Sequence, residues 1–198
     1  MKKLSTACII FSLLFSVASF AQKIKKVKFG LFTDVHVPTM HDAKERITAF
    51  MDSMKTAKPD FIMELGDFGT PAPKYAYGFE IWKSYPGLKY QVIGNHEMDG
   101  GFSLQQALDY RGMPSSYYSF ENNGFYFIVL DGNDKKTPDV KGYQQYMGEK
   151  QLAWLKDELD KAKLPIVIFS HQGLGKDGVD NAADIRAMLE IHNKKAKK

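Results

Sequence analysis

The sequence predicts a one-domain α/β protein whose sheet is covered on both faces. Short runs that are apolar throughout alternate along the chain with segments whose apolar residues recur at helical spacing. Strands of this kind are typical of sheets that are buried on both faces. The chain has 198 residues, of which 44% are hydrophobic and 25% charged, which is ordinary composition for one globular domain.

The balance of charges argues against nucleic acid as a specific partner. The 27 basic residues are nearly offset by 23 acidic ones, and Lys2 and Lys3 contribute to the excess before the body of the chain begins. A second basic run at residues 194–198 is interpreted as a solvated end. The rest of the sequence has no basic stripe of the kind that nucleic-acid binders carry.

Residues 1–21 have the layout of a secretory signal peptide. Two lysines precede an apolar run, and small residues at Ser19 and Ala21 predict cleavage between Ala21 and Gln22. A membrane anchor is the alternative, but the run is short and contains serines, whereas a spanning helix needs ~20 apolar residues. We therefore expect a secreted or periplasmic protein that has no membrane association after the signal is removed.

Cys8 is the only cysteine, and it leaves with the signal. The mature chain then has no disulfide and no thiolate ligand, so any metal site must be built from His, Asp, Glu and Asn. Lipid attachment at Cys8 is a less favoured alternative, because no long apolar run precedes it.

The first half of the chain predicts three strands and two helices. Ile47, Phe50, Met51 and Met54 recur at helical spacing, and Pro59 breaks the pattern before the next apolar run. The expected elements are a strand at 27–33, a helix at 41–57, a strand at 61–65, a loop at 66–77, a short helix at 79–85 and a strand at 89–93.

The second half adds a hairpin to this alternation. Ser103 and Gln106 form a capping-box pattern that opens a helix. Residues 117–120 and 125–130 are β-like and flank a polar turn, which predicts a hairpin and a mixed or second sheet. The remaining elements are a helix at 149–162, a strand at 165–169 and a final helix striped by Ile185, Met188 and Leu189.

Polar side chains that can bind a metal ion directly follow four of the predicted strands. These residues are Asp34 and His36, then Asp67, then Asn95 with His96 and Glu97, and finally His171. Ligands bind at the carboxyl ends of the strands in an open α/β sheet. We therefore expect four loops to bring oxygen and imidazole groups to one edge.

The residue types and their spacing suit divalent cations. Asp34 and His36 are two apart in an extended chain, so both side chains are expected on the same face. Carboxylate, imidazole and amide groups suit ions such as Zn, Mn or Fe. A carboxylate that bridges two ions, such as Asp67, would set them ~3.5–4 Å apart. Gly66 and Gly94 would let the backbone turn sharply just before a ligand.

Each of these residues alone has a simpler interpretation. Asp34 could cap a helix, Asp67 and Asn95 could form turns, and His171 could lie at the edge of a core. Together these residues follow four strands in the order Asp-x-His, Gly-Asp, Gly-Asn-His-Glu and His. This order favours the metal site over the separate interpretations.

Several neighbours stay outside the predicted ligand set. Asp131 is interpreted as a turn residue, and His41 opens a helix, where a surface role is common. Glu97 and Asp99 could either support the ligands or face solvent. Four loop aromatics could stack a base or pack locally, namely Phe68, Tyr75, Tyr77 and Phe102.

The order of the motifs resembles the calcineurin-like metallophosphoesterase superfamily. Its pattern is Asp-x-His, Gly-Asp, Gly-Asn-His-Asp/Glu, His and finally Gly-His-x-His. The resemblance covers residues 26–191, and Gly94-Asn-His-Glu97 is its most specific part. Four segments look similar to the branch that includes ADP-ribose/CDP-alcohol diphosphatases and purple-acid-phosphatase-like proteins, namely 117–120, 127–132, 151–155 and 169–171.

This resemblance implies a four-layer α/β/β/α sandwich with two divalent metal ions at one edge. The implied ligands are Asp34, His36 and Asp67 for the first ion, and Asp67, Asn95 and His171 for the second. Asn95 and His96 would contact the phosphate of the substrate. His96 would protonate the leaving oxygen or stabilise charge, while an activated water attacks phosphorus.

The last motif of the family pattern, Gly-His-x-His, is not found after the final predicted helix. Only residues 192–198 follow, and His192 at a helix end is a poor substitute. We therefore interpret residues 22–198 as a metallophosphoesterase domain that is truncated at the C-terminus and lacks its last strands and this motif. Three protein ligands can suffice for a catalytic ion, although its affinity should drop.

The expected function is that of a secreted, metal-dependent phosphoesterase. Its substrate would be a phosphorylated small molecule with a phosphomonoester, phosphodiester or pyrophosphate bond. The alternative is a truncated, catalytically weak or inactive homologue that binds phosphorylated ligands. Metal content separates the two, because about two ions per chain would support the enzyme.

Overall fold

The computed structural model describes residues 25–37, 39–137 and 141–196. The signal peptide predicted for residues 1–21 lies outside these ranges. Within them, no helix combines the length and the apolar character that crossing a bilayer requires.

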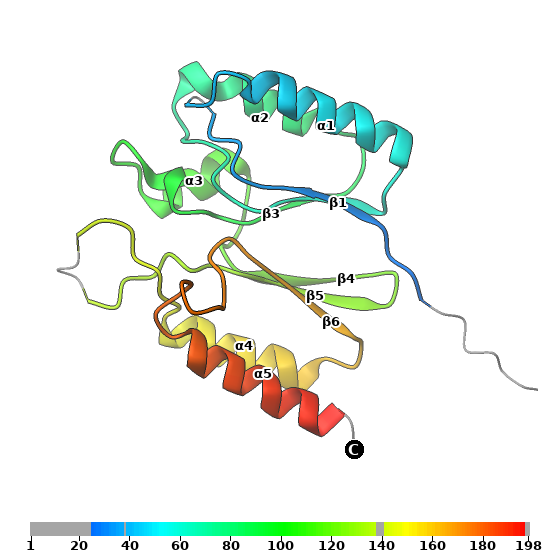
Figure 1. The fold of residues 1–198 in the computed structure, drawn as a ribbon, viewed down its shortest axis with the longest axis vertical. Coiled ribbons are helices and arrows are strands. Elements are labelled where there is room, and N and C mark those ends of the chain that lie inside the picture. Colours follow the sequence, from blue (N-terminus) through cyan, green and yellow to red (C-terminus); the bar gives the residue numbers. More distant parts are fainter. Residues whose placement is uncertain (1–24, 38, 138–140, 197–198) are drawn as a thin grey trace, which may run out of the picture.

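A pair of helices and a parallel sheet form the first two layers of the fold (Figure 1). The strands are β1 (Phe29–Phe32), β2 (Phe61–Glu64) and β3 (Lys89–Gln91), and the helices are α1 (Ala43–Ala57) and α2 (Ala76–Lys83). All three strands are parallel, in the order β1-β2-β3. Ile47 and Met51 of α1 and Trp82 of α2 pack against Ile62 of β2 in one buried cluster.

A second sheet and a second pair of helices form the other two layers. The strands are β4 (Tyr118–Asn122), β5 (Phe125–Leu130) and β6 (Ile166–Ser170), and the helices are α4 (Glu149–Lys161) and α5 (Ala182–Ala196). The β4–β5 pair is the predicted hairpin, and β6 runs parallel to β5. Leu155 of α4 and Ile185 of α5 pack against Ile128 and Leu130 of β5.

Aromatic side chains fill the space between the two sheets. Phe61 on β2 lies 5.1 Å from Phe127 on β5, measured between ring centroids, and Phe29 on β1 lies 5.6 Å from Phe169 on β6. Edge-to-face and stacked pairs of this kind contribute roughly 0.5–1.5 kcal/mol each beyond the area that they bury. These contacts place β1 opposite β6 and β2 opposite β5.

The predicted α/β class and the four-layer arrangement are confirmed. Both faces of each sheet are covered, as predicted, with helices on one face only. The other face of each sheet packs against the second sheet, and the central strands β2 and β5 are accordingly the most buried.

A local sequence signal accounts for the start of one helix. At the start of α3 (Leu104–Arg111), the side chain of Ser103 accepts from Gln106 N at 3.2 Å and Gln106 Oε1 accepts from Ser103 N at 2.8 Å, which is the predicted capping box. Helix α2 begins earlier than predicted, at Ala76, because a single 3-10 turn at Pro73–Tyr75 leads directly into it.

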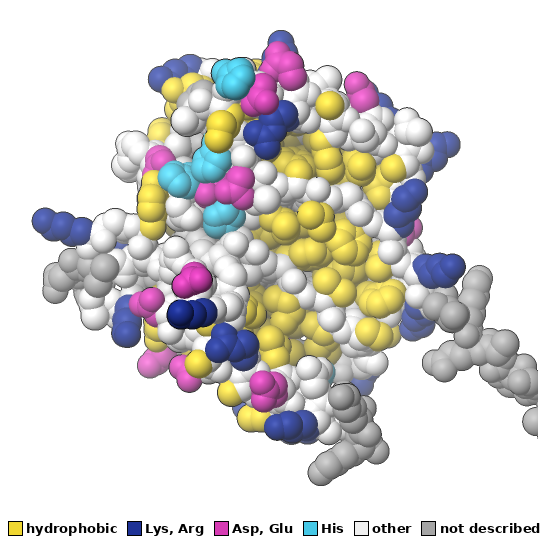
Figure 2. Space-filling view, in the orientation of Figure 1, with side chains coloured by type: hydrophobic (Ala, Val, Ile, Leu, Met, Phe, Trp, Pro, Cys, Tyr) yellow, Lys and Arg dark blue, Asp and Glu magenta, His cyan; other side chains and the backbone are white. Residues whose placement is uncertain are grey.

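Strands β1 and β6 lie at the edges of the two sheets, on the same side of the molecule. Among the described residues, neither strand pairs with another along its outer side. Hydrophobic side chains gather over this face (Figure 2), and Leu31 of β1 is 48% exposed.

Replacement of Phe127 tests the layer between the sheets. Phe127→Ala is expected to lower the free energy of unfolding by about 3–5 kcal/mol, because the ring is fully buried among Phe61, Phe120 and Phe169. Urea unfolding followed by circular dichroism measures the change. Leu31→Ala, on the open edge, is the control and should cost about 0.5 kcal/mol or less; equal losses in the two variants would contradict this packing.

Candidate metal centre

The chain segments that follow β1 and β2 continue side by side beyond the sheet. Asp34 N donates to Gly66 O at 3.1 Å, and His36 N donates to Asp67 O at 2.9 Å. Asp34, His36 and Asp67 all have positive φ, at 56°, 51° and 56°. Such backbone costs on the order of 1–3 kcal/mol per non-glycine residue and is concentrated at functional sites.

These φ angles correct the backbone conformation that the sequence predicted for Asp34 and His36. Asp34 and His36 do lie on the same side, with His36 Nε2 3.4 Å from Asp34 Oδ1. The extended chain assumed for them is wrong, because both residues adopt the left-handed conformation. Val35, which lies between them, is buried in the hydrophobic core against α1, and its burial anchors the loop.

Asp67 lies at the centre of a cluster of imidazoles. Its Oδ2 is 3.2 Å from His171 Nε2, 3.8 Å from His36 Nε2 and 3.9 Å from His96 Nε2. Asp67 is only 3% exposed. Figure 2 shows the histidines and carboxylates gathered on the surface next to the sheets.

Two overlapping groups have ligand atoms within 4.8 Å of one another. They are His36, Asp67 and His96, and Asp34, Asp67 and His171. Asp67 belongs to both groups, as a residue that bridges two ions must. The assignment of the other ligands to particular ions stays a prediction.

The charges of the cluster fit a divalent cation. Burial opposes ionisation of Asp67, but hydrogen bonds from His171 and His96 and the charges of both rings lower its pKa. Burial likewise opposes the charged form of His171, yet the hydrogen bond and the charge of Asp67 raise the pKa of His171 to about 9. A positive charge is therefore favoured beside Asp67, where a metal ion can take the place of the proton.

The ring of His171 is oriented for metal binding. Its Nδ1 lies 2.9 Å from Leu65 O, and because a carbonyl only accepts, Nδ1 carries the hydrogen. Nε2 is then the nitrogen that faces Asp67, which is the orientation seen in metal-ligating histidines. Gly66 permits this contact, since a Cβ there would lie 2.8 Å from His171 Nδ1.

A buried carboxylate, Glu97, holds the loops together. Its Oε2 accepts from Gly94 N at 2.7 Å and Asp67 N at 3.1 Å, and its Oε1 accepts from Phe68 N at 2.6 Å. Of the two interpretations left open by the sequence, support of the ligands is the one that this geometry fits. At Gly94 the backbone is so close that a Cβ would collide with Oδ1 and the backbone nitrogen of Asp67.

Arg111 of α3 joins Glu97 to a second buried carboxylate, Glu64 on β2. Arg111 Nη1 donates to Glu97 Oε1 at 2.9 Å, and Nη2 donates to Glu64 Oε2. Glu64 Oε1 accepts from Gly66 N at 2.6 Å. Burial, opposed by Arg111 and reinforced by Glu97, raises the pKa of Glu64 to about 7.

Sequence reasoning missed Glu64 and Arg111. The available signal was Glu64 itself, a carboxylate inside the otherwise apolar run of β2, because buried charges are retained only with a partner.

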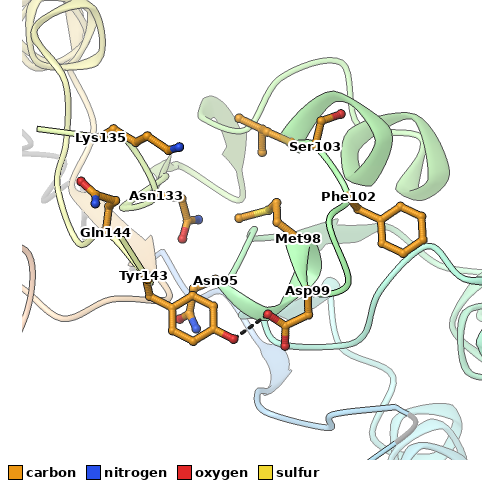
Figure 3. A pocket seen from close by; sticks show the side chains of 11 residues that line it. Asn95, Met98, Asp99, Phe102, Ser103, Asn133, Lys135, Tyr143 and Gln144 are labelled. Carbon is orange, nitrogen blue, oxygen red and sulfur yellow. Dashed lines mark hydrogen bonds between the residues drawn. The ribbon is translucent and has the colours of Figure 1, made fainter. Parts of the chain in front are cut away.

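Asn95 directly precedes the short 3-10 turn at His96–Met98, and His96 N donates to Asp67 Oδ1 at 2.9 Å. Asn95 lines a cavity of about 500 Å³ that adjoins the cluster, together with Met98, Asn133 and Tyr143 (Figure 3). The ligand role predicted for Asn95 stays a prediction.

The other residues that the sequence analysis considered lie outside the cluster around Asp67. His41 is exposed before α1, and His192 lines a groove between α4 and α5. Phe68 is buried against the first helix pair, so local packing is its role. Phe102 borders the cavity, but its ring points away from Asn133 in Figure 3.

Comparison with known proteins agrees with this geometry. The sequence model described as calcineurin-like phosphoesterase matches residues 27–196. None of the curated proteins matches the chain.

Solved structures share the fold at low sequence identity. A dimetal phosphatase from Danio rerio is 16% identical with a TM-score of 0.70, over 84% of this chain and 78% of that one. The phosphopantetheinyl hydrolase of Mycobacterium tuberculosis is 11% identical with a TM-score of 0.51, over 82% and 79%. A purple acid phosphatase of yellow lupin, Lupinus luteus, is 15% identical with a TM-score of 0.50, over 75% and 31%.

Metal binding should release protons, because the raised pKa of His171 keeps it protonated at neutral pH in the metal-free protein. We expect affinity for Mn²⁺ to rise by up to roughly tenfold per pH unit between about pH 6 and pH 8. Calorimetric titration in two buffers of different ionisation enthalpy should show about one proton released per chain. Affinity that does not change with pH would contradict the proposed pairing of His171 with Asp67.

Glu97→Gln tests the support of the loops. The variant keeps one acceptor oxygen but loses the charge that holds Arg111, so Mn²⁺ affinity should fall by about 10–100-fold. The exposed Glu45→Gln serves as a matched control and should bind as the wild type does. Unchanged affinity in a folded Glu97→Gln protein would show that the loops do not depend on this carboxylate.

Proposed function

The chain belongs to the calcineurin-like phosphoesterase family, and from this premise we propose that it is a metal-dependent hydrolase of phosphorylated small molecules. The observation that carries the proposal is the cluster around Asp67, placed at the carboxyl ends of the strands and beside a cavity of about 500 Å³ that Asn95 and Asp99 line. The bond cleaved would be a phosphomonoester, phosphodiester or pyrophosphate.

Two divalent ions, of Mn, Zn or Fe, would be held by carboxylate, imidazole and amide groups. The proposed ligands are Asp34, His36, Asp67, Asn95 and His171. Oxygen and nitrogen donors without a thiolate suit these ions. When bound, such ions lower the pKa of water and neutralise charge that develops on the phosphoryl group.

The residues of the chain supply binding and proton transfer. Asn95 lines the cavity and His96 belongs to the adjoining cluster, where both would contact the phosphate of a substrate. His96 would donate a proton from Nε2 to the leaving oxygen, the general-acid role that histidine most often fills. Gly94 and Glu97 hold this turn against Asp67, so the donor is fixed in place before substrate arrives.

We also propose that the protein acts after export, in the periplasm or outside the cell. The support for this is the signal-peptide pattern of residues 1–21.

Asp67→Asn should remove hydrolysis of p-nitrophenyl phosphate by the Mn²⁺-loaded protein, by a factor on the order of 100 or more in kcat, because no other carboxylate is shared by both ligand groups. A chelator should abolish wild-type activity, and Mn²⁺ should restore it. The exposed Asp157→Asn is the matched control and should keep full activity. Turnover that survives chelation, or an active Asp67→Asn variant, would refute the proposed chemistry.

A further inference from the structure

Tyr143 and Asp99 enclose His96 on the side that faces away from Asp67. Tyr143 Oη donates to Asp99 Oδ1 at 2.5 Å, and Asp99 Oδ2 lies 2.7 Å from His96 Nδ1. Tyr143 Oη is also 3.0 Å from His96 Nδ1, and the two rings lie 4.7 Å apart between centroids. The Tyr143 to Asp99 hydrogen bond is visible in Figure 3.

These contacts fix which nitrogen of His96 faces the metal cluster. A carboxylate accepts from Nδ1–H, so Nδ1 is occupied and Nε2 points toward Asp67, at 3.9 Å from its Oδ2. A second ring, that of His36, packs edge-on against His96 at 5.0 Å. Rotation of the imidazole would therefore break a hydrogen bond and disturb packing on both sides.

The segment that carries Tyr143 is itself anchored to the end of β5. Tyr146 N donates to Gly132 O at 2.9 Å, and Asp134 N donates to Tyr146 O at 3.1 Å. Tyr143 is nevertheless 52% exposed, so loss of its hydroxyl does not threaten the core.

The same two residues form a wall of the cavity beside the cluster. Asp99 and Tyr143 line it on one side, and Met98, Asn133 and Lys135 contribute other walls (Figure 3). Both carboxylate oxygens of Asp99 are engaged, one by Tyr143 and one by His96. A substrate group in the cavity would therefore meet the tyrosine ring and hydroxyl next to the proton donor.

We propose that this cavity is the leaving-group subsite and that Tyr143 is a positioning residue that holds His96, through Asp99, toward the leaving oxygen. The inference rests on the proposed phosphoesterase function. In the step concerned, a water oxygen forms a new bond to phosphorus and gives up a proton to solvent, while the bond to the leaving oxygen breaks and its electron pair stays on that oxygen. That oxygen takes the proton from His96 Nε2, and the neutral imidazole keeps its Nδ1–H bond to Asp99.

Two substrates that differ only in the leaving group test the proposal. Phenolate needs protonation as it leaves, whereas p-nitrophenolate needs little. Tyr143→Phe should lower kcat for phenyl phosphate on the order of tenfold and kcat for p-nitrophenyl phosphate by about twofold or less, with KM unchanged. Asp99→Asn should show the same selectivity with a larger loss. Tyr117→Phe, which loses a hydroxyl from a ring packed on Trp154, is the control and should match the wild type.

The results of these assays distinguish a failure of the positioning role of Tyr143 from a failure of the proposed phosphoesterase function. Equal losses on both substrates, or no loss, would overturn the role of Tyr143. A wild type that hydrolyses neither ester would overturn the proposed function.

A spectroscopic readout of the positioning needs no turnover. Ring ¹⁵N signals of His96 in the metal-free protein, assigned with His96→Gln, should show protonated Nδ1 in the wild type and a shifted tautomer balance in Asp99→Asn and Tyr143→Phe. Identical spectra for all three proteins would contradict the inference.

Discussion

The site depends on one buried network, in which Arg111 lies between the carboxylates of Glu97 and Glu64. Through these two acids a single guanidinium fixes the backbone at Gly66, Asp67 and Gly94. Breaking a buried pair of this kind costs several kcal/mol, since it leaves an uncompensated charge. The network therefore gives the strand-end loops a stiffness that surface loops ordinarily lack, and it can offset the strain of the left-handed residues that carry the ligands.

The four layers explain why the ligands converge. Aromatic packing between the sheets places β6 opposite β1. The loop after β6 is therefore held next to the loop after β2. His171 can then donate to Leu65 O and face Asp67, although it lies 104 positions further along the chain. Packing at the centre of the molecule thus determines distances at its edge, and the edge is where the proposed chemistry takes place.

Sequence reasoning was strongest where the signals are local. The capping box of Ser103 and the polar residues after four strands were predictable, because each depends on neighbours in the chain. The left-handed backbone of Asp34 and His36 was not, since it results from hydrogen bonds to the loop after β2. Arg111 and Tyr143 carried no signal either, because their partners lie far away in sequence and are brought near only by the fold.

The most direct test of the account is the stoichiometry and magnetic coupling of bound Mn²⁺. We expect calorimetric titration to give two ions per chain, and electron paramagnetic resonance of the loaded protein to show an exchange-coupled pair, as Asp67 shared between ions at ~3.5–4 Å requires. One ion per chain with an uncoupled spectrum, or no binding, would contradict a dinuclear centre built on Asp67.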